Sequence, residues 1–395
     1  MSPELIAHIK SRSEALFEKV KKYREHLHKH PELSYQEIET MNFVSEHLSK
    51  LGIPHQKNIG GTGVVGIIES EKHMGMKALA LRADLDALPI QEENEVSYKS
   101  INSGVMHACG HDVHTSILLG TAEILNEIKD RLPQPVKLIF QPGEEKNPGG
   151  ATYMIRDGVL TNPKVEKIIA LHVFPELNVG EVGFRSGKYM ASCDEIYITI
   201  LGKGGHGATP HLCIDPIVIG ANLILQLQQI ISRKCDAKTP SVLSFGHFEA
   251  LGATNIIPGK AILKGTFRTM DETWREEALE LLSHQIESIV SAHGAKVELE
   301  ISRGYPCVVN DENVTSELVH KAQSMLGEEK VHQLPIRLTS EDFAFYSQQI
   351  PACFFRLGVR NENKGIVHSV HHPRFDIDSD ALKVGMQIMS SACFR

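Results

Sequence analysis

The stretch Val136-Lys-Leu-Ile-Phe-Gln-Pro-Gly-Glu-Glu145 joins a short apolar run to two adjacent carboxylates. A run of this length that ends near a Pro-Gly pair is typical of a buried strand. Similar runs cover residues 63–68, 77–82 and 167–173, and a helical pattern lies between them at residues 114–128. Strands that alternate with helices predict an α/β fold with a mostly parallel sheet flanked by helices.

The pattern changes after about residue 185, where half-exposed strands and two long helices replace the buried runs. The expected strands are residues 195–201, 241–248, 261–269 and 296–302, and the expected helices are residues 215–232 and 272–293. This combination is typical of a compact α+β domain. We therefore expect a discontinuous α/β domain, residues 1–185 and 301–395, interrupted by an inserted α+β domain at residues 186–300.

Composition limits the class of function. The 395 residues carry a formal charge of -8 and no Lys/Arg-rich tract, which argues against a nucleic-acid partner. The longest apolar stretch, residues 217–231, is interrupted by polar residues and is too short to span a membrane. We see no signal-peptide pattern, and the seven cysteines, an odd number without framework spacing, fit a reducing compartment. We therefore expect a cytoplasmic protein without a membrane partner.

Side chains that can bind metals recur at the expected strand ends. They are the thiol and imidazole of Cys109-Gly-His111, the pair Glu144-Glu145, His172, and the closing His371-His372-Pro373. Taken singly, Cys109-Gly-His111 is equally consistent with a core Cys and a surface His, the Glu pair is more typical of solvated loop charges, and His172 is more typical of a core residue. Taken together at one edge of a sheet, thiolate, imidazole and carboxylate groups favour a zinc-like metal over calcium or magnesium.

Two features of this set point to hydrolysis. A bridging thiolate or carboxylate allows a site to hold two metal ions. A Glu beside a ligand Glu is the general base expected in metal-assisted hydrolysis. A separate window, His26, His28 and His30, is expected on the polar side of an exposed helix, and we interpret it as structural.

With these motifs the chain resembles the M20 family of metallopeptidases and amidohydrolases. More narrowly, it is similar to the N-acyl-amino-acid amidohydrolases: aminoacylase, hippurate hydrolase and the indoleacetyl-amino-acid hydrolases. The matching motifs follow one another over nearly the whole chain: Leu27-His-Lys-His-Pro-Glu-Leu, Leu81-Arg-Ala-Asp-Leu-Asp-Ala-Leu-Pro, Met106-His-Ala-Cys-Gly-His-Asp-Val-His, Gln141-Pro-Gly-Glu-Glu, Leu171-His-Val, Gly204-Gly-His-Gly-Ala-Thr-Pro-His, Asn255-Ile-Ile-Pro, Ser340-Glu-Asp-Phe and His371-His-Pro.

The resemblance implies a divalent metal centre with two ions per subunit, of Zn, Mn, Co or Ni. The implied ligands are Cys109, His111, Glu145, His172 and His371, with Glu144 as catalytic base. Most of the wider family has His-x-Asp where this chain has Asp84-Leu85-Asp86, a departure that the narrower subfamily shares. A ligand role therefore does not carry over to Asp84, whereas Asp86 is implied to be a catalytic-site residue that orients the ligands.

The inserted domain resembles the lid of the family, which mediates dimerisation, so the resemblance implies a homo-oligomer, either dimer or tetramer. His206, in a glycine-rich loop, is implied to contact the substrate and stabilise the oxyanion of the tetrahedral intermediate. Asn255 and Arg268 are implied to bind the substrate carboxylate. Whether His206 serves its own subunit or a neighbouring one stays open.

The sequence thus predicts a metal-dependent amidohydrolase whose partner is a small N-acyl amino acid, such as an N-acetyl or benzoyl compound. A dipeptidase or carboxypeptidase with the same metal core is the nearest alternative. A non-catalytic binding protein of the same fold and a structural zinc protein are the others, although Glu144 and every implied ligand are present. One sequence does not determine the acyl group, the preferred amino acid or the native metal.

Overall fold

The computed structural model describes residues 1–394, and in it the chain forms two compact units. Unit 1 comprises Met1–Gly187, Val309–Pro335 and the chain from Asp342 onward. Unit 2 comprises Lys188–Val308 and the short segment Ile336–Glu341. Each unit has its own hydrophobic core.

Unit 1 is built on an eight-stranded sheet in the order β1-β2-β4-β3-β5-β16-β6-β15. Its strands are β1 (His55–Ile59), β2 (Gly63–Ile68), β3 (Ala78–Asp84), β4 (Val136–Gln141), β5 (Val165–Asn178), β6 (Val182–Phe184), β15 (Val331–Gln333) and β16 (Ala352–Arg360). The central strands β4, β3, β5 and β16 run parallel, whereas β1 and β2 are antiparallel to their neighbours. The expected α/β class with a mostly parallel sheet is confirmed.

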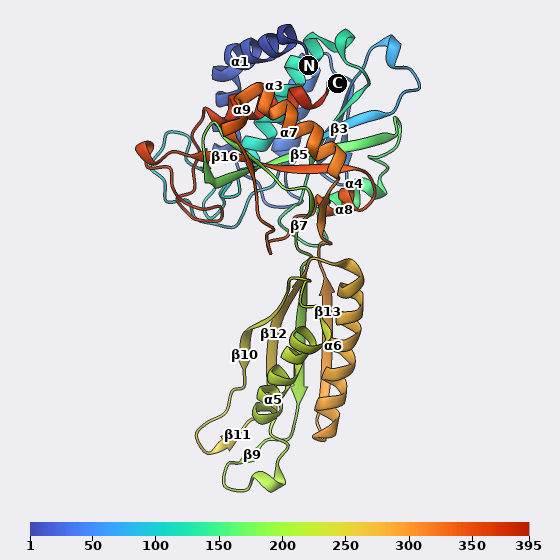
Figure 1. Cartoon of the computed structure of the whole chain (residues 1–395). Helices are drawn as coiled ribbons and strands as arrows, with labels where there is room; N and C mark the ends of the chain where they lie inside the picture. The colour runs from blue at the N-terminus through green and yellow to red at the C-terminus, as the bar shows by residue number, and fades with distance from the viewer. Residues whose placement is uncertain (395) are drawn as a thin grey trace. The chain divides into compact units, whose positions relative to one another are not determined.

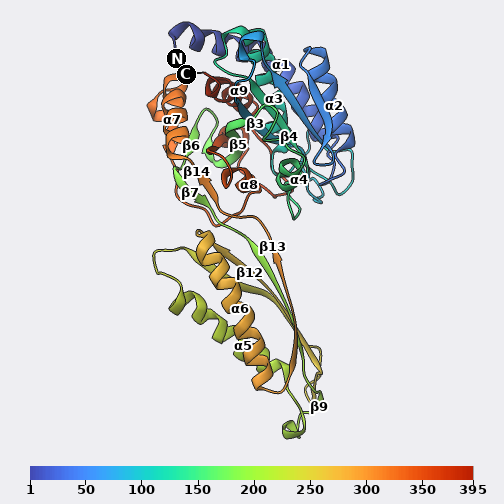
Figure 2. The same ribbon diagram turned by 90° about the vertical axis from the view of Figure 1, so that its right-hand side faces the viewer.

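Helices cover both faces of this sheet, which is why β3 and β4 are buried at every residue. The long helices are α1 (Pro3–Lys29), α2 (Ile38–Lys50), α3 (His111–Glu127), α7 (Glu312–Leu326) and α9 (Ala381–Ala392). The helices α1, α3 and α9 pack against one another on one side of the sheet. The short helices α4 (Gly150–Arg156) and α8 (Ala344–Ser347) lie on the other side (Figures 1 and 2).

The expectation for the first histidine window is wrong at His28, which is fully buried on α1. Its Nδ1 lies 2.8 Å from Asp112 Oδ2 on α3, and Arg24 Nε donates to the same oxygen over 2.8 Å. Burial favours the neutral acid, but Arg24 and His28 together hold the pKa of Asp112 far below its usual range. The polar side of α1 is expected from the sequence to face water. At His28, the Asp112 carboxylate on the neighbouring helix α3 instead compensates for the burial of the polar side chain.

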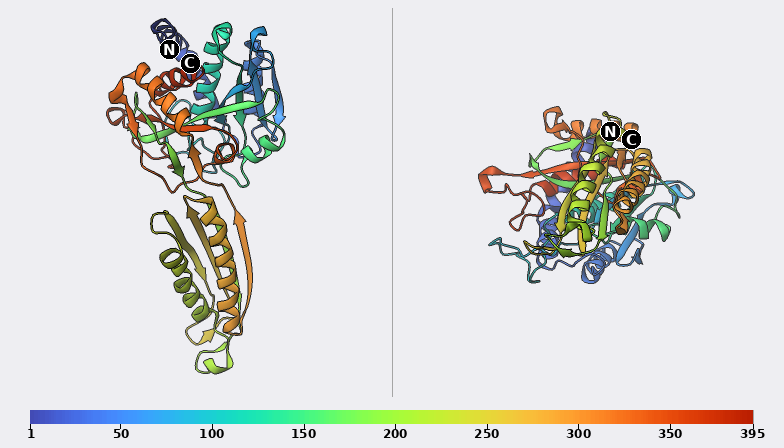
Figure 3. Two further views of the ribbon diagram at one scale, coloured as in Figure 1. Left: turned by 45° about the vertical axis from the view of Figure 1, so that its right-hand side comes forward. Right: turned by 90° about the horizontal axis from the view of Figure 1, so that it is seen from below.

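Unit 2 contains a four-stranded antiparallel sheet in the order β10-β12-β8-β13. These strands are β8 (Asp194–Leu201), β10 (Ser241–Glu249), β12 (Lys260–Thr269) and β13 (Lys296–Arg303). The helices α5 (Pro216–Gln229) and α6 (Glu272–Ala292) pack against one face of this sheet (Figure 3). The core between them includes alternate residues of β8, namely Ile196, Ile198 and Ile200, because the helices cover one face of the sheet.

The remaining strands are short. They are β7 (Gly187–Met190), β9 (Gly205–His206), β11 (Ile256–Ile257) and β14 (Val308–Asn310). The pair β9 and β11 forms a small antiparallel ladder. Within residues 1–394, no helix combines the length and the apolar character needed to cross a bilayer.

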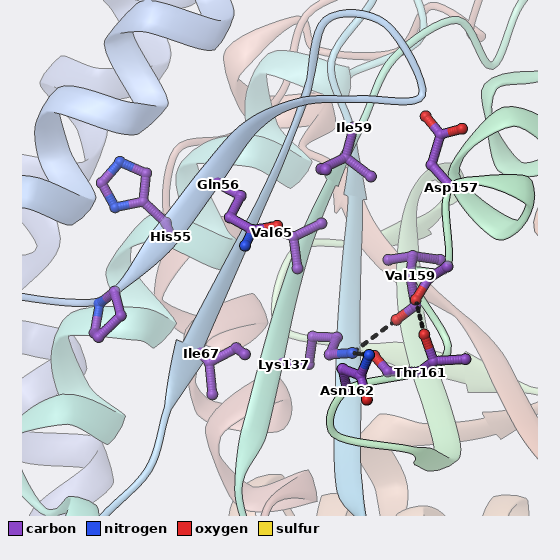
Figure 4. Close-up of a pocket in the computed structure, with 12 residues that line it drawn as sticks. His55, Gln56, Ile59, Val65, Ile67, Lys137, Asp157, Val159, Thr161 and Asn162 are labelled. Carbon is purple, nitrogen blue, oxygen red and sulfur yellow. Dashed lines mark hydrogen bonds between the residues drawn. The ribbon is translucent and has the colours of Figure 1, made fainter.

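A cavity of about 350 Å³ lies in unit 1 near the beginning of β4, lined in part by Lys137, Val159 and Thr161 (Figure 4). The Lys137 ammonium donates to the carbonyl oxygens of Val159, Thr161 and Pro163 over 2.8, 2.5 and 3.0 Å. Burial lowers the pKa of Lys137 to about 8. The lysine thus fastens the turn after α4 to the beginning of β4, at the opposite end of the strand from Glu144 and Glu145.

Candidate metal centre

The predicted ligands meet at the carboxyl edge of the central strands, where ligand sites of open α/β sheets usually lie. Glu145 follows β4, His172 lies on β5, and His111 is the first residue of α3. Cys109 precedes Gly110, whose φ of +85° lets the chain turn sharply into the helix. His371 comes from the segment before α9, and its backbone N–H donates to Ala108 O over 2.7 Å.

The Cys109 thiol lies at the middle of this group. Its Sγ is 3.3 Å from His172 Nε2 and 3.3 Å from His371 Nε2. Glu145 Oε1 is 3.3 Å from His371 Nε2 and 3.9 Å from His111 Nε2. The structure therefore brings all five predicted ligands together.

The donor atoms form two overlapping triads, each with its atoms within 4.8 Å of one another. One triad is Cys109, His111 and His172, and the other is Cys109, Glu145 and His371. Both contain the same thiol. A pair of metal positions bridged by one thiolate would use the donors in this arrangement.

Two of the imidazoles, those of His111 and His172, are oriented by hydrogen bonds on their far sides. His111 Nδ1 lies 3.1 Å from Asp86 Oδ1, and His172 Nδ1 donates to Val173 O over 2.8 Å. Each ring thereby presents Nε2 to the centre, as metal-binding histidines do. His111 Nε2 and Glu145 Oε1 are buried polar atoms with no hydrogen-bond partner among the described residues. Buried ligand atoms of this kind, without a hydrogen-bond partner, fit a bound cation.

The electrostatics of the cluster also favour a cation. Burial and the Glu145 and Glu144 carboxylates raise the pKa of the Cys109 thiol well above its ordinary value. Burial opposes charge on His111, yet the carboxylates of Asp84 and Asp86 raise its pKa to about 10. Anionic groups therefore dominate this pocket, and a divalent ion would offset them and favour the thiolate.

Asp84 and Asp86 have different roles in the structure. Asp84 Oδ1 lies 2.6 Å from His114 Nδ1, and Arg82 Nη1 donates to Asp84 Oδ2 over 2.6 Å. Asp86 contacts His111 through Oδ1, and its Oδ2 accepts the backbone N–H of Glu145 over 3.0 Å. Asp86 thus orients two of the predicted ligands, whereas Asp84 is held by an ion pair beneath them.

The predicted base Glu144 is 6 % exposed and lies beside the second triad. One carboxylate oxygen of Glu144 comes within 4.8 Å of donor atoms of His111 and Glu145. The backbone N–H of Asp342 approaches Glu144 Oε1 at 3.4 Å. Glu144 is therefore placed at the edge of the cluster, close to the ligands.

The three predicted substrate-binding residues lie in unit 2. His206 and Asn255 are exposed neighbours, because Gly207 N donates to Asn255 O over 2.8 Å and β9 pairs with β11. Arg268 lies near the end of β12, where its Nη1 donates to Leu338 O over 2.9 Å. The structure brings His206 and Asn255 together and leaves Arg268 at the other end of β12.

A second group of residues around the centre was not predicted from the sequence. Asp342 is fully buried and accepts hydrogen bonds from Arg82 Nη2 and Gln141 Nε2 over 2.7 and 2.8 Å. The only signal for it was the motif Ser340-Glu-Asp-Phe, to which no role was attached. The turn formed by residues 34–37 was missed as well.

The fold and the donor set define a metal-dependent hydrolase. Residues 80–395 match the model of peptidase family M20/M25/M40, and the chain belongs to that family. It is 43% identical over 288 residues to the N-acyl-L-amino acid amidohydrolase of Geobacillus stearothermophilus, covering 73% of this chain and 77% of the relative.

Two further relatives cover nearly the whole chain. Thermostable carboxypeptidase 2 of Saccharolobus solfataricus is 38% identical over 385 residues, which are 97% of this chain and 96% of the relative. The solved structure of Bacillus subtilis YXEP, a dinuclear metal binding peptidase from the M20 family, has a TM-score of 0.81 and 33% identity. That match covers 96% of this chain and 98% of the other.

Removal of the Asp86 carboxylate should weaken metal binding. Asp86→Ala leaves the Nδ1 atom of His111 and the backbone N–H of Glu145 without their acceptor, so the affinity for Zn²⁺ should fall by about 10- to 100-fold. Asp86→Asn keeps one acceptor oxygen and should lose less. Competition titration with a chromogenic chelator measures the affinity.

The matched control is Asp311→Ala, because the Asp311 carboxylate caps α7 by accepting the N–H of Val314. This variant should keep its metal affinity. An unchanged affinity in folded Asp86→Ala would contradict the orienting role.

Proposed function

We propose that the chain cleaves the amide bond of N-acyl amino acids and that its centre holds two divalent ions, of Zn, Mn, Co or Ni. The observation that carries the proposal is the pair of donor triads that share the Cys109 thiol, with Glu144 beside them. The identity to an N-acyl-L-amino acid amidohydrolase supports the substrate class.

The chain itself supplies the proton transfers. A divalent ion bound by the triads would polarise the acyl carbonyl and lower the pKa of water. The Glu144 carboxylate accepts the proton of the attacking water and then passes it to the leaving amine. Glu145 cannot share this role, because a carboxylate that binds metal is not free to move protons.

The hydrogen bonding of His206 suits an oxyanion donor. Its Nδ1 accepts the backbone N–H of Ala208 over 3.0 Å, so the ring proton sits on Nε2. The ring is exposed and can reach a ligand. In the proposal, Nε2–H of His206 stabilises the oxyanion of the tetrahedral intermediate, while Asn255 and Arg268 bind the substrate carboxylate.

The spacing of these residues favours a site shared between subunits. From Lys260 to Arg268 the strand β12 extends roughly 26 Å at about 3.3 Å per residue, and β11 precedes Lys260. One small N-acyl amino acid cannot touch both ends of that strand. We therefore propose that His206 and Asn255 of one copy serve a substrate bound with Arg268 of another copy.

The surface of unit 2 offers an interface for this assembly. Ile219, Leu223 and Leu227 of α5 are buried, but Val218 and Leu225 on the same helix are 61% and 71% exposed. The strand β10 is an edge of the four-stranded sheet, and edge strands can pair with a strand of another copy. We propose a homodimer or tetramer formed through this unit, in the cytoplasm, where the seven free thiols would stay reduced.

The second candidate function is a carboxypeptidase, which the identity to thermostable carboxypeptidase 2 favours. The two candidates differ in the group on the substrate nitrogen. An amidohydrolase of this kind takes N-acyl amino acids, whereas a dipeptidase or carboxypeptidase takes peptides. Comparison of kcat/KM for N-acetyl, N-benzoyl and unblocked dipeptide substrates separates them.

Chelation should abolish turnover, because the proposed reaction needs a divalent ion to polarise the acyl carbonyl and to lower the pKa of the attacking water. Dialysis against EDTA followed by readdition of Zn²⁺, Mn²⁺, Co²⁺ or Ni²⁺ should restore activity to different extents. Metal content is measured by elemental analysis of the same samples. Full activity in a metal-free sample would refute the proposal.

Substitution of Glu144 and substitution of Glu145 should have different effects. Glu144→Gln keeps the size and polarity of the side chain but removes the base, so kcat should fall by about 10²–10⁴-fold with metal still bound. Glu145→Gln replaces an anionic ligand with a neutral one and should lower metal affinity first. Kinetics and metal content of both variants measure this. The opposite pattern would mean that the two roles are reversed.

Charge on the exposed face of α5 should dissociate the oligomer. Val218→Glu and Leu225→Glu place carboxylates in the proposed interface and should reduce the mass measured by multi-angle light scattering. Met74→Glu, which changes an 88% exposed residue of unit 1, is the matched control and should leave the mass unchanged. A monomeric wild-type protein at working concentration would contradict the interface.

A further inference from the structure

We propose that Ser34–Glu37, called here the 34–37 turn, is a positioning element that holds the loop carrying Glu144 and Glu145. The inference rests on the roles proposed above for those two carboxylates. The turn follows α1 and touches the 143–146 loop and Asp86 through three different side chains.

The contacts reach both ends of the loop. Glu37 Oε1 accepts the backbone N–H of Gly143 over 2.8 Å, directly before Glu144. The Tyr35 hydroxyl donates to Lys146 O over 2.9 Å, directly after Glu145. Between these points, the Ser34 hydroxyl donates over 2.6 Å to Asp86 Oδ2, which also accepts the Glu145 N–H.

Gly143 allows the turn to lie this close. Its φ is +58°, and a Cβ built on it would stand 2.3 Å from Tyr35 Cε1. Any side chain at residue 143 would therefore displace the tyrosine ring. The backbone of the loop packs directly on the ring, and the loop cannot move toward the turn.

The 34–37 turn is itself held by hydrogen bonds to residues outside the 143–146 loop. The Glu32 carboxylate accepts the N–H groups of Glu39 and Thr40 at the start of α2, and Ala87 N donates to Glu32 O over 2.8 Å. The Thr62 hydroxyl donates to the second oxygen of Glu37. The turn is thus tied to α2, to the residue after Asp86 and to the start of β2, and can act as a rigid support.

Displacement of a general base lowers the rate of the catalysed reaction. A misplacement of about 1 Å in a reacting group can cost on the order of 10²-fold in rate. Neither Tyr35 nor Glu37 belongs to the donor triads, so their loss should shift Glu144 without removing a ligand. The expected effect is therefore on kcat more than on KM.

The test compares two variants that remove the contacts with one that keeps an acceptor. Glu37→Ala and Tyr35→Ala remove the contacts and should lower kcat by about 10- to 100-fold with little change in KM. Glu37→Gln keeps an oxygen acceptor for Gly143 N–H and should restore most of kcat. Burial and the nearby Asp86 carboxylate raise the pKa of Glu37 to about 7. The neutral amide of the glutamine therefore resembles the protonated carboxyl group that Glu37 readily forms.

The matched control is Tyr98→Phe. It removes a tyrosine hydroxyl that donates to Asp376 Oδ2 over 2.8 Å and does not touch the loop. Its kcat should stay at the wild-type value, whereas Tyr35→Phe should lose part of kcat. Melting temperatures of all variants identify any that are simply unfolded.

A double variant ties the effect to Glu144. If the turn acts by placing that base, Glu37→Ala should add little to the loss already caused by Glu144→Gln. Full additivity, a wild-type kcat in folded Glu37→Ala, or a failure of Glu37→Gln to restore kcat would overturn the inference.

A spectroscopic readout separates this inference from the proposed function. In the Co²⁺-loaded protein, visible absorption depends on the geometry of the ligands, which include Glu145. The band should change in Glu37→Ala and return in Glu37→Gln, even if no substrate in the panel is hydrolysed. An identical spectrum in all variants would refute the positioning of the loop, whereas inactivity of the wild-type protein would refute only the proposed function.

Discussion

The buried carboxylate of Asp86 is the contact on which the geometry of the metal centre depends. It accepts hydrogen bonds from Ser34 and from the backbone of Glu145, and its other oxygen faces His111. These partners come from segments that are far apart in the sequence. A buried anion is stable only when its oxygens are satisfied. The contacts that satisfy this buried anion are therefore also the contacts that place two candidate ligands.

A second buried charge, the guanidinium of Arg82, secures the loop from the sheet side. It donates to Asp84 over 2.6 Å and to Asp342 over 2.7 Å. Asp342 in turn accepts the N–H of Ala151 at the start of α4 over 3.0 Å. Loss of one member would leave a buried charge without its partner, at a cost of about 3–5 kcal/mol. The loop between β4 and α4 is thus held by charge pairs on one side and by the 34–37 turn on the other.

The sequence predicts those parts of the structure that depend on residues close together in the chain. The strands β2 and β4 are predictable because strands buried on both faces are apolar throughout, and the candidate ligands follow from short motifs. The helix α7 was not predicted, although its buried residues Val314, Leu318 and Ala322 have helical spacing. The turn could not be predicted, because Ser34, Tyr35 and Glu37 contact partners 52, 111 and 106 residues away. Only tertiary folding gives such ordinary residues a role.

The distribution of unsatisfied atoms separates the support from the reactive part of the site. The carboxylates of Asp84, Asp86, Asp342 and Glu37 are each engaged by donors. By contrast, His111 Nε2 and Glu145 Oε1 are buried and have no hydrogen-bond partner within residues 1–394. Each such atom costs about 1–3 kcal/mol, which a fold tolerates only where surrounding contacts leave no alternative conformation. The satisfied outer groups provide that constraint, and the unsatisfied inner atoms are what a metal ion would bind.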